Sequence, residues 1–247
     1  MTDYKEILMI LLLAHILSDF YFQSEFMAIK KKIEVNYVWI HSMLYGVVTW
    51  SVLNLFFKNI ESIFVWAIIL SHLLIDLLKY YLEKRGIIKK YQKYIFSIDQ
   101  TIHIFILIVV AYFMIKSGKI YKYNPTFLNV LNTLGISISF LIVLFVQILL
   151  IHKPTNIFIV NILQFYKPVD KENNNENTKK AGKMIGTIER IIMLFFLLMK
   201  QYSSVGLVLT AKSIARYNKI SEDQEFAEYY LLGTLLSTIS VLMISII

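Results

Sequence analysis

The chain has 247 residues, of which 57% are hydrophobic and none is cysteine, and its formal net charge is +8. Soluble domains are about 45–50% apolar, so this composition predicts an integral membrane protein that is embedded in the lipid bilayer. The absence of cysteine excludes disulfides, thiolate catalysis and Cys-ligated zinc. Only three of the 25 basic residues are arginine, and the lysines gather in short connecting segments, so we expect no specific nucleic-acid binding.

Apolar segments long enough to cross a hydrocarbon core of about 30 Å recur along the chain. We predict membrane helices at about 7–23, 37–57, 62–82, 95–115, 127–151 and 226–246. The first segment lacks a small-residue cleavage site and is expected to be retained as a helix.

The segments between residues 152 and 217 are less regular. Residues 155–166 follow Pro154 and are predicted to form an interfacial helix, and the polar run 170–180 is predicted to form a mobile loop. Two short apolar halves, 187–199 and 203–211, predict either one tilted span or a re-entrant hairpin within 187–217. The fold class is therefore an all-α membrane protein, a polytopic helical bundle of six or seven spans. We divide it into a four-helix domain, 1–123, and a C-terminal membrane region, 124–247.

Basic residues predict the orientation of the chain. Lysine and arginine are concentrated after the first, third and fifth helices, and positive segments face the cytoplasm. We therefore expect a multi-pass protein of the cytoplasmic (inner) membrane with its N-terminus outside. Oligomerisation is compatible with this topology.

Histidine and aspartate recur in the membrane segments at a spacing of four residues. The pairs are His15–Asp19, His72–Asp76 and Asp99–His103, and another segment carries His41. Residues i and i+4 share a helix face, and ionisable groups in lipid are costly and usually functional. With the predicted orientation, all seven groups lie at one depth near the cytoplasmic side. The first two helices and the next two also resemble a repeated helical hairpin.

This pattern favours a metal site. The proposed ligands are His15, Asp19, His41, His72, Asp76, Asp99 and His103, a set that suits a divalent metal ion, with zinc or manganese favoured. Asp76 or Asp99 could act as general base in a metal-dependent hydrolase of a phosphorylated or lipidic substrate. The same residues could instead serve a metal-ion or proton transporter or channel, or form interhelical hydrogen bonds in a non-catalytic component that recruits a soluble partner.

A second cluster lies in the C-terminal region. Arg190, Lys212, Ser213 and Arg216 could bind the phosphate of a lipid or a nucleotide. The alternative is that these basic side chains extend to the membrane interface and neutralise helix ends. His152 lies at a helix end and is expected to be interfacial rather than a ligand.

Several motifs in the chain resemble a known family. The first third carries H-x3-D-F-x2-Q from His15, then His41, then H-x3-D from His72 and D-Q-x2-H from Asp99. This set resembles a bacterial membrane family catalogued as domain of unknown function 3307, over residues of about 5–115. The stretches 182–190, 211–216 and 227–237 are similar to the C-terminal region of its longer members. The resemblance implies no particular activity, and an analogy with membrane-bound metal-dependent hydrolases adds only modest support to hydrolysis.

Overall fold

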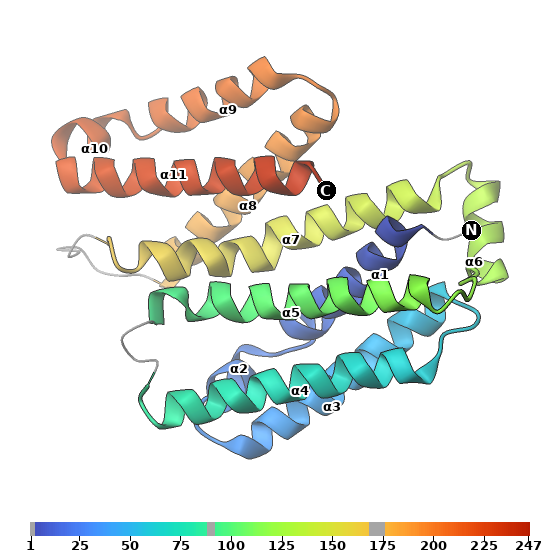
Figure 1. Cartoon of the computed structure of the whole chain (residues 1–247). Coiled ribbons are helices and arrows are strands. Elements are labelled where there is room, and N and C mark those ends of the chain that lie inside the picture. Colours follow the sequence, from blue (N-terminus) through green and yellow to red (C-terminus); the bar gives the residue numbers. More distant parts are fainter. Residues whose placement is uncertain (1–2, 88–91, 168–175) are drawn as a thin grey trace. The chain divides into compact units, whose positions relative to one another are not determined.

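The computed structural model describes residues 3–87, 92–167 and 176–247. All regular elements in these ranges are helical, so the predicted all-α fold is confirmed (Figure 1). Five helices among the described residues are long and apolar enough to cross a membrane, which fits a multi-pass membrane protein. They are Val35–Phe56, Ser62–Lys84, Tyr94–Lys116, Ile138–Leu163 and Gln224–Ser245. The full number of spans, six or seven, stays a prediction.

The chain forms two compact units, Met1–Val146 and Gln147–Ile247. The division between them falls inside one helix rather than in a linker. The functional division at residue 123 that we expected from the sequence stays a prediction.

The first unit is built on four helices. They are α1 (Tyr4–Ile16), α3 (Val35–Phe56), α4 (Ser62–Lys84) and α5 (Gln92–Lys116). Helix α1 packs on α3 and α5, α3 on α4, and α4 on α5, so the four helices enclose a shared interior. Helix α1 is apolar on all sides, and most of its residues are buried, as expected for a helix surrounded by protein. A capping box formed by Asp3 and Glu6 begins it.

Helix α1 ends in a π-helical turn, η1 (Leu17–Tyr21), which contains Asp19. The Phe22 amide donates to the Leu17 carbonyl at 2.9 Å, a bond across five residues. Such turns are rare and are often found at functional sites. The short helix α2 (Glu25–Lys30) follows and contacts α3.

The connections after α3 and α5 meet at the same end of the first unit. The Lys58 amide donates to the Lys122 carbonyl at 2.9 Å, and the Asn124 amide donates to the Phe56 carbonyl at 2.8 Å. Helices α3 and α5 therefore run in the same direction, as the sequence predicts. Helix α6 (Pro125–Thr133) follows this connection.

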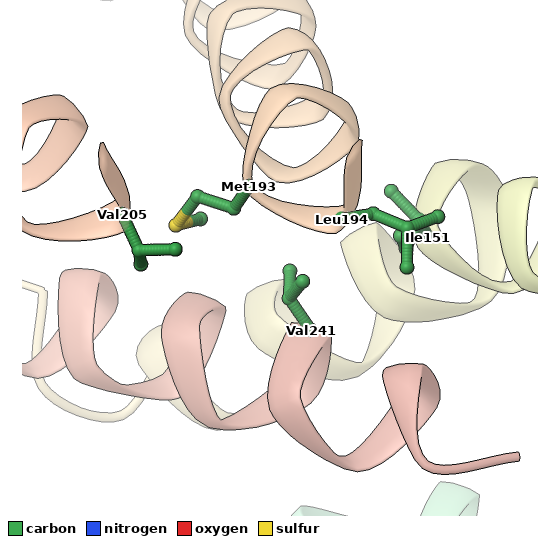
Figure 2. Packing of buried hydrophobic residues seen from close by; sticks show 5 residues of the cluster. All are labelled: Ile151, Met193, Leu194, Val205 and Val241. Carbon is green, nitrogen blue, oxygen red and sulfur yellow. The ribbon is translucent and has the colours of Figure 1, made fainter. Parts of the chain in front are cut away.

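The second unit contains α8 (Glu176–Leu198), α9 (Tyr202–Ile214), α10 (Tyr217–Glu222), α11 (Gln224–Ser245) and the latter part of α7 (Ile138–Leu163). Its apolar core joins α7, α8, α9 and α11 (Figure 2). The core residues are Ile151, Met193, Leu194, Val205 and Val241. Helices α8 and α9 pack together as a hairpin, with Lys200 in the left-handed region at the turn (φ 59°). A hairpin was one of our two expectations for 187–217; its position in a membrane stays a prediction.

Three sequence expectations about helix boundaries were wrong. The helix predicted at 127–151 is interrupted, because Gly135 adopts φ 66° and separates α6 from α7. The helix predicted to end before Pro154 continues through it to Leu163. Pro154 has no N–H for the Leu150 carbonyl, but the Thr155 hydroxyl donates to that carbonyl at 2.8 Å. The expected loop at 170–180 falls partly outside the described residues, and from Glu176 onward the backbone is helical.

Candidate metal centre

The seven predicted histidines and aspartates come together inside the first unit. The turn η1 contributes Asp19, and the helices α1, α3, α4 and α5 contribute the others. The four histidines are at most 4% exposed, and the side chains of the three aspartates are at most 9% exposed. One ligand atom from each member of three sets lies within 4.8 Å of the other members. The sets are His15–Asp19–His72, His41–His72–Asp76 and Asp76–Asp99–His103.

Asp19 accepts hydrogen bonds from three other helices. Its Oδ1 lies 3.0 Å from Nε2 of His41 and 3.3 Å from Nε2 of His72. Its Oδ2 accepts from Nε2 of Gln100 at 3.1 Å. An ionised carboxylate can only accept hydrogen bonds, so neutral rings at positions 41 and 72 carry their protons on Nε2. The Nδ1 atoms of these two rings are therefore left with free lone pairs.

The same logic fixes the tautomer of His15. Because Gln100 donates its amide to Asp19, its Oε1 faces Nε2 of His15 at 3.2 Å, and that nitrogen must donate. Nδ1 of His15 is then the acceptor for the Tyr45 hydroxyl, 3.3 Å away. A directed chain of hydrogen bonds therefore runs from Tyr45 to the carboxylate of Asp19.

The other two aspartates each form an ion pair with a lysine. Nζ of Lys31 lies 3.0 Å from Oδ2 of Asp76, and Nζ of Lys79 lies 2.9 Å from Oδ2 of Asp99. The lysine side chains are 14% and 21% exposed, so they lie nearer to the surface than the carboxylates. Buried carboxylates need such compensation, because an unpaired charge in the interior is strongly destabilising.

Four buried polar atoms in this centre have no hydrogen-bond partner among the described residues. They are Nδ1 of His41, Nδ1 of His72, Oδ1 of Asp99 and Nε2 of His103. Buried polar groups are nearly always satisfied, so this cluster of atoms without partners is a candidate site for a bound cation. Oδ1 of Asp99 and Nε2 of His103 are 3.8 Å apart. Two ligand atoms at about 2.1 Å from a divalent ion lie roughly 3.0–3.4 Å apart, so a small closure would let both bind one ion.

Ring stacking holds the imidazoles in place. The Tyr45 ring stacks on His72 with centroids 3.7 Å apart, and His72 stacks on His103 at 4.5 Å. The His15 ring lies 5.3 Å from that of His103. Immobilised ligand side chains favour metal binding because little conformational entropy remains to be lost.

Sequence analysis missed three residues that contact the centre, namely Lys31, Lys79 and Tyr45. A signal was present for two of them. Lys79 is three residues after Asp76 and Tyr45 is four after His41, so each shares a helix face with a predicted ligand. Lys31 could not be found in this way, because it reaches Asp76 from the connection after α2, 45 residues away.

The predicted phosphate-binding residues lie apart from this centre in the sequence, in the second unit. Arg190, Lys212 and Arg216 line a cavity there, together with residues of α7 and α11. Ser213 is not among the lining residues, and its hydroxyl donates to the Leu209 carbonyl at 3.0 Å.

A comparison with protein families gives a match to the family described as Protein of unknown function (DUF3307). The match covers residues 7–131, just over half of the chain. The chain belongs to this family. The matched range contains all seven histidines and aspartates of the centre. No curated protein and no solved structure matches the chain.

Proposed function

We propose that the first unit binds a divalent metal ion and uses it to hydrolyse a phosphorylated or lipidic ester. The observation that carries this proposal is the pair of buried, unsatisfied ligand atoms, Oδ1 of Asp99 and Nε2 of His103, 3.8 Å apart. Interhelical hydrogen bonding alone does not account for a carboxylate oxygen and an imidazole nitrogen buried in this way.

Asp76, Asp99 and His103 are the proposed primary ligands, since they form one of the three compact sets. A second ion could be held by His41 and His72, with Asp76 shared between the two positions. The ligand set contains imidazole and carboxylate but no thiolate, which suits zinc or manganese. Asp19 is assigned a different role from the one expected from sequence. It accepts Nε2 protons from two histidines, as carboxylates around metal-binding histidines commonly do.

When bound, a divalent ion would supply Lewis-acid activation of a water molecule or of the substrate ester. The ammonium groups of Lys31 and Lys79 lie on the more exposed side of the carboxylates, where they could bind an anionic substrate group. If Lys79 moved to a phosphate oxygen, Oδ2 of Asp99 would be released to accept a proton, while Oδ1 of the same carboxylate would stay on the metal. This oxygen of Asp99 is thus available as a base only once the substrate has engaged Lys79.

Elemental analysis of untagged, detergent-purified protein tests metal binding. We expect one or two equivalents of one transition metal in the wild type after incubation with zinc or manganese. Asp99→Asn and His103→Ala should lose the metal, because each removes a proposed ligand. The matched controls are His152→Ala, which changes the one histidine outside the centre, and Asp223→Asn, an N-cap that asparagine fills equally well. A folded wild type that retains no metal under these conditions would refute the proposal.

Transport of a metal ion or protons is the second candidate, favoured by the near-complete burial of the centre among helices that can span a membrane. Ion transport can be measured only across a sealed membrane, whereas hydrolysis does not require one. Hydrolysis of aryl phosphate or short-chain lipid esters should proceed in detergent and be lost in Asp99→Asn. Ion uptake into proteoliposomes, abolished by the same substitution and without ester turnover in detergent, would instead establish transport.

We also propose that the protein lies in the cytoplasmic (inner) membrane with its N-terminus on the side that faces away from the cytoplasm. Because the chain contains no cysteine, single cysteines can be introduced and labelled in intact cells with a membrane-impermeant reagent. Asn59→Cys, between α3 and α4, should be labelled, and Arg85→Cys, after α4, should not. The reverse pattern would invert the orientation.

A further inference from the structure

The second unit contains a buried arginine whose charge is not neutralised by a carboxylate among the described ion pairs. Arg190 in α8 is 3% exposed. Its Nε donates to the Ile151 carbonyl at 3.3 Å, and its Nη2 donates to Oδ1 of Asn156 at 2.6 Å. Its Nη1 donates to the Ser237 hydroxyl at 3.4 Å. All these acceptors are neutral, so the protein orients the guanidinium without a carboxylate in direct contact with it among the described ion pairs.

The acidic neighbour of Arg190 has another partner. Oε2 of Glu189 lies 2.7 Å from Nζ of Lys212, and both side chains are largely buried. Among the described residues that line the cavity, Glu189 is the one acidic residue, whereas five are basic. The basic residues are Lys167, Lys183, Arg190, Lys212 and Arg216. The described lining therefore carries more positive than negative charge, which favours an anionic ligand.

The cavity has a volume of about 680 Å³, within the range of about 300–1,000 Å³ that is usual for small-molecule sites. Helices α7, α8, α9 and α11 all contribute to it. Apolar side chains cover part of its wall, including Ile159, Leu163 and Phe226. A fully hydrated ion gains nothing from an apolar wall, whereas a bound acyl or isoprenyl chain would cover that wall and remove its apolar surface from water.

Glycine keeps the space beside the guanidinium open. A Cβ atom at Gly186 would lie 3.3 Å from Nη1 of Arg190, closer than a relaxed contact. A Cβ atom at Gly182, which also lines the cavity, would meet nothing within 4 Å. Substitution at Gly182 therefore offers a way to fill the cavity without disturbing Arg190.

We infer that this cavity binds a ligand that joins a phosphate group to an apolar chain, with the phosphate held by Arg190, Lys183 and Arg216. Arg190 uses four of its five N–H groups on protein acceptors and keeps one for the phosphate. Arg216 can bind two phosphate oxygens at once through its planar guanidinium, which lysine cannot do. The apolar wall takes the chain. This site is independent of the metal centre in the first unit, and the failure of one proposal leaves the other unaffected.

Ligand binding can be measured by thermal stability of the purified protein in neutral detergent with three added probes. The probes are dioctanoyl phosphatidic acid, dioctanoyl glycerol, which lacks the phosphate, and glycerol 3-phosphate, which lacks the chains. We expect saturable stabilisation by phosphatidic acid and none by dioctanoyl glycerol. Stabilisation by glycerol 3-phosphate at similar concentrations would show that the apolar chain is not needed and would overturn the inference, whereas its absence supports a ligand that carries an apolar chain.

The variants Arg216→Gln and Lys183→Gln should each weaken phosphatidic acid binding about tenfold, because each removes one charge-assisted hydrogen bond. Gly182→Leu should weaken it by filling the cavity, with all five basic residues kept. Lys200→Gln is the matched control, since it removes one positive charge from the same unit at an exposed residue that does not line the cavity. Equal stabilisation by dioctanoyl glycerol, or an unchanged affinity in all three cavity variants, would overturn the inference.

Discussion

The replacement Asp19→Asn tests whether this residue orients the metal-binding histidines or binds the metal itself. Its Oδ1 accepts from His41 at 3.0 Å and His72 at 3.3 Å, and asparagine can keep these bonds through its own Oδ1. Its Oδ2 becomes an amide that faces the amide of Gln100, 3.1 Å away in the wild type. Two donors then oppose each other, so the side chain at position 100 has to rotate and the chain of hydrogen bonds to His15 reverses.

The expected size of the effect separates the two roles. A lost hydrogen bond between membrane helices costs on average only about 0.6 kcal/mol of stability, so the protein should remain folded. Loss of an orienting partner typically lowers metal affinity about 10–100-fold, or roughly 1.4–2.8 kcal/mol. Removal of a ligand, as in Asp99→Asn, should have a much larger effect because the ion loses a charged contact.

Competition with a chromophoric chelator measures the metal affinity of each variant in neutral detergent. Gln100→Leu provides the control for charge, since it disturbs the same network but leaves the carboxylate bonded to both histidines; its affinity should stay near that of the wild type. If Asp19→Asn abolished binding as fully as Asp99→Asn, Asp19 would be a ligand and our assignment would be wrong. An unchanged metal affinity in Asp19→Asn would show that the hydrogen bonds of Asp19 do not contribute to metal binding. Nitrogen NMR of the imidazoles should show protonated Nε2 at positions 41 and 72 in the wild type.

Two further predictions concern the ion pair between Lys79 and Asp99 and the proline in α7. Lys79→Met removes the ammonium group 2.9 Å from Asp99, so the metal-free variant should melt at a lower temperature than the metal-free wild type. Added zinc or manganese should raise the melting temperature of the variant more than that of the wild type. An equal metal-induced rise in both proteins would contradict the view that lysine and metal compensate the same carboxylate. Thr155→Val leaves the Leu150 carbonyl without its hydroxyl donor, which should lower the free energy of unfolding by about 1–3 kcal/mol. Adding Pro154→Ala to this variant should restore much of the lost stability, because alanine supplies a backbone N–H for that carbonyl. If the double variant is no more stable than Thr155→Val in urea or thermal unfolding, the hydroxyl is not replacing that bond.

Hydrophobic segment length was enough to predict most of the helical framework. The segments expected at 37–57, 62–82, 95–115 and 226–246 correspond to α3, α4, α5 and α11 within a few residues. The same criterion failed at 127–151, because apolar residues flank Gly135 on both sides and hide the turn that it makes. It failed again at Pro154, where a threonine hydroxyl replaces the missing backbone donor.

The residues of the centre could be predicted, but not the way in which they are connected. Spacing along single helices identifies the histidines and aspartates, because residues i and i+4 share a face. It does not reveal that Asp19 contacts His41 and His72 from other helices, which depends on the π-helical turn and on how the helices pack. Nor does it show that a lysine counted as part of a positive connecting segment forms an ion pair with Asp76.

The pattern of satisfied and unsatisfied atoms is the best argument that this centre does more than hold helices together. If packing were its only role, every buried polar atom should have found a protein partner, as all three aspartates partly have. Instead, the hydrogen bonds to Asp19 use the Nε2 protons of two histidines and leave their Nδ1 lone pairs free. Asp99 is likewise satisfied through Oδ2 by Lys79, while its Oδ1 remains unpaired near Nε2 of His103. Oδ1 of Asp99 and the two Nδ1 atoms are able to bind a cation, as is Nε2 of His103 when its ring proton is on Nδ1. Their neighbours supply the second contacts that orient metal ligands in proteins.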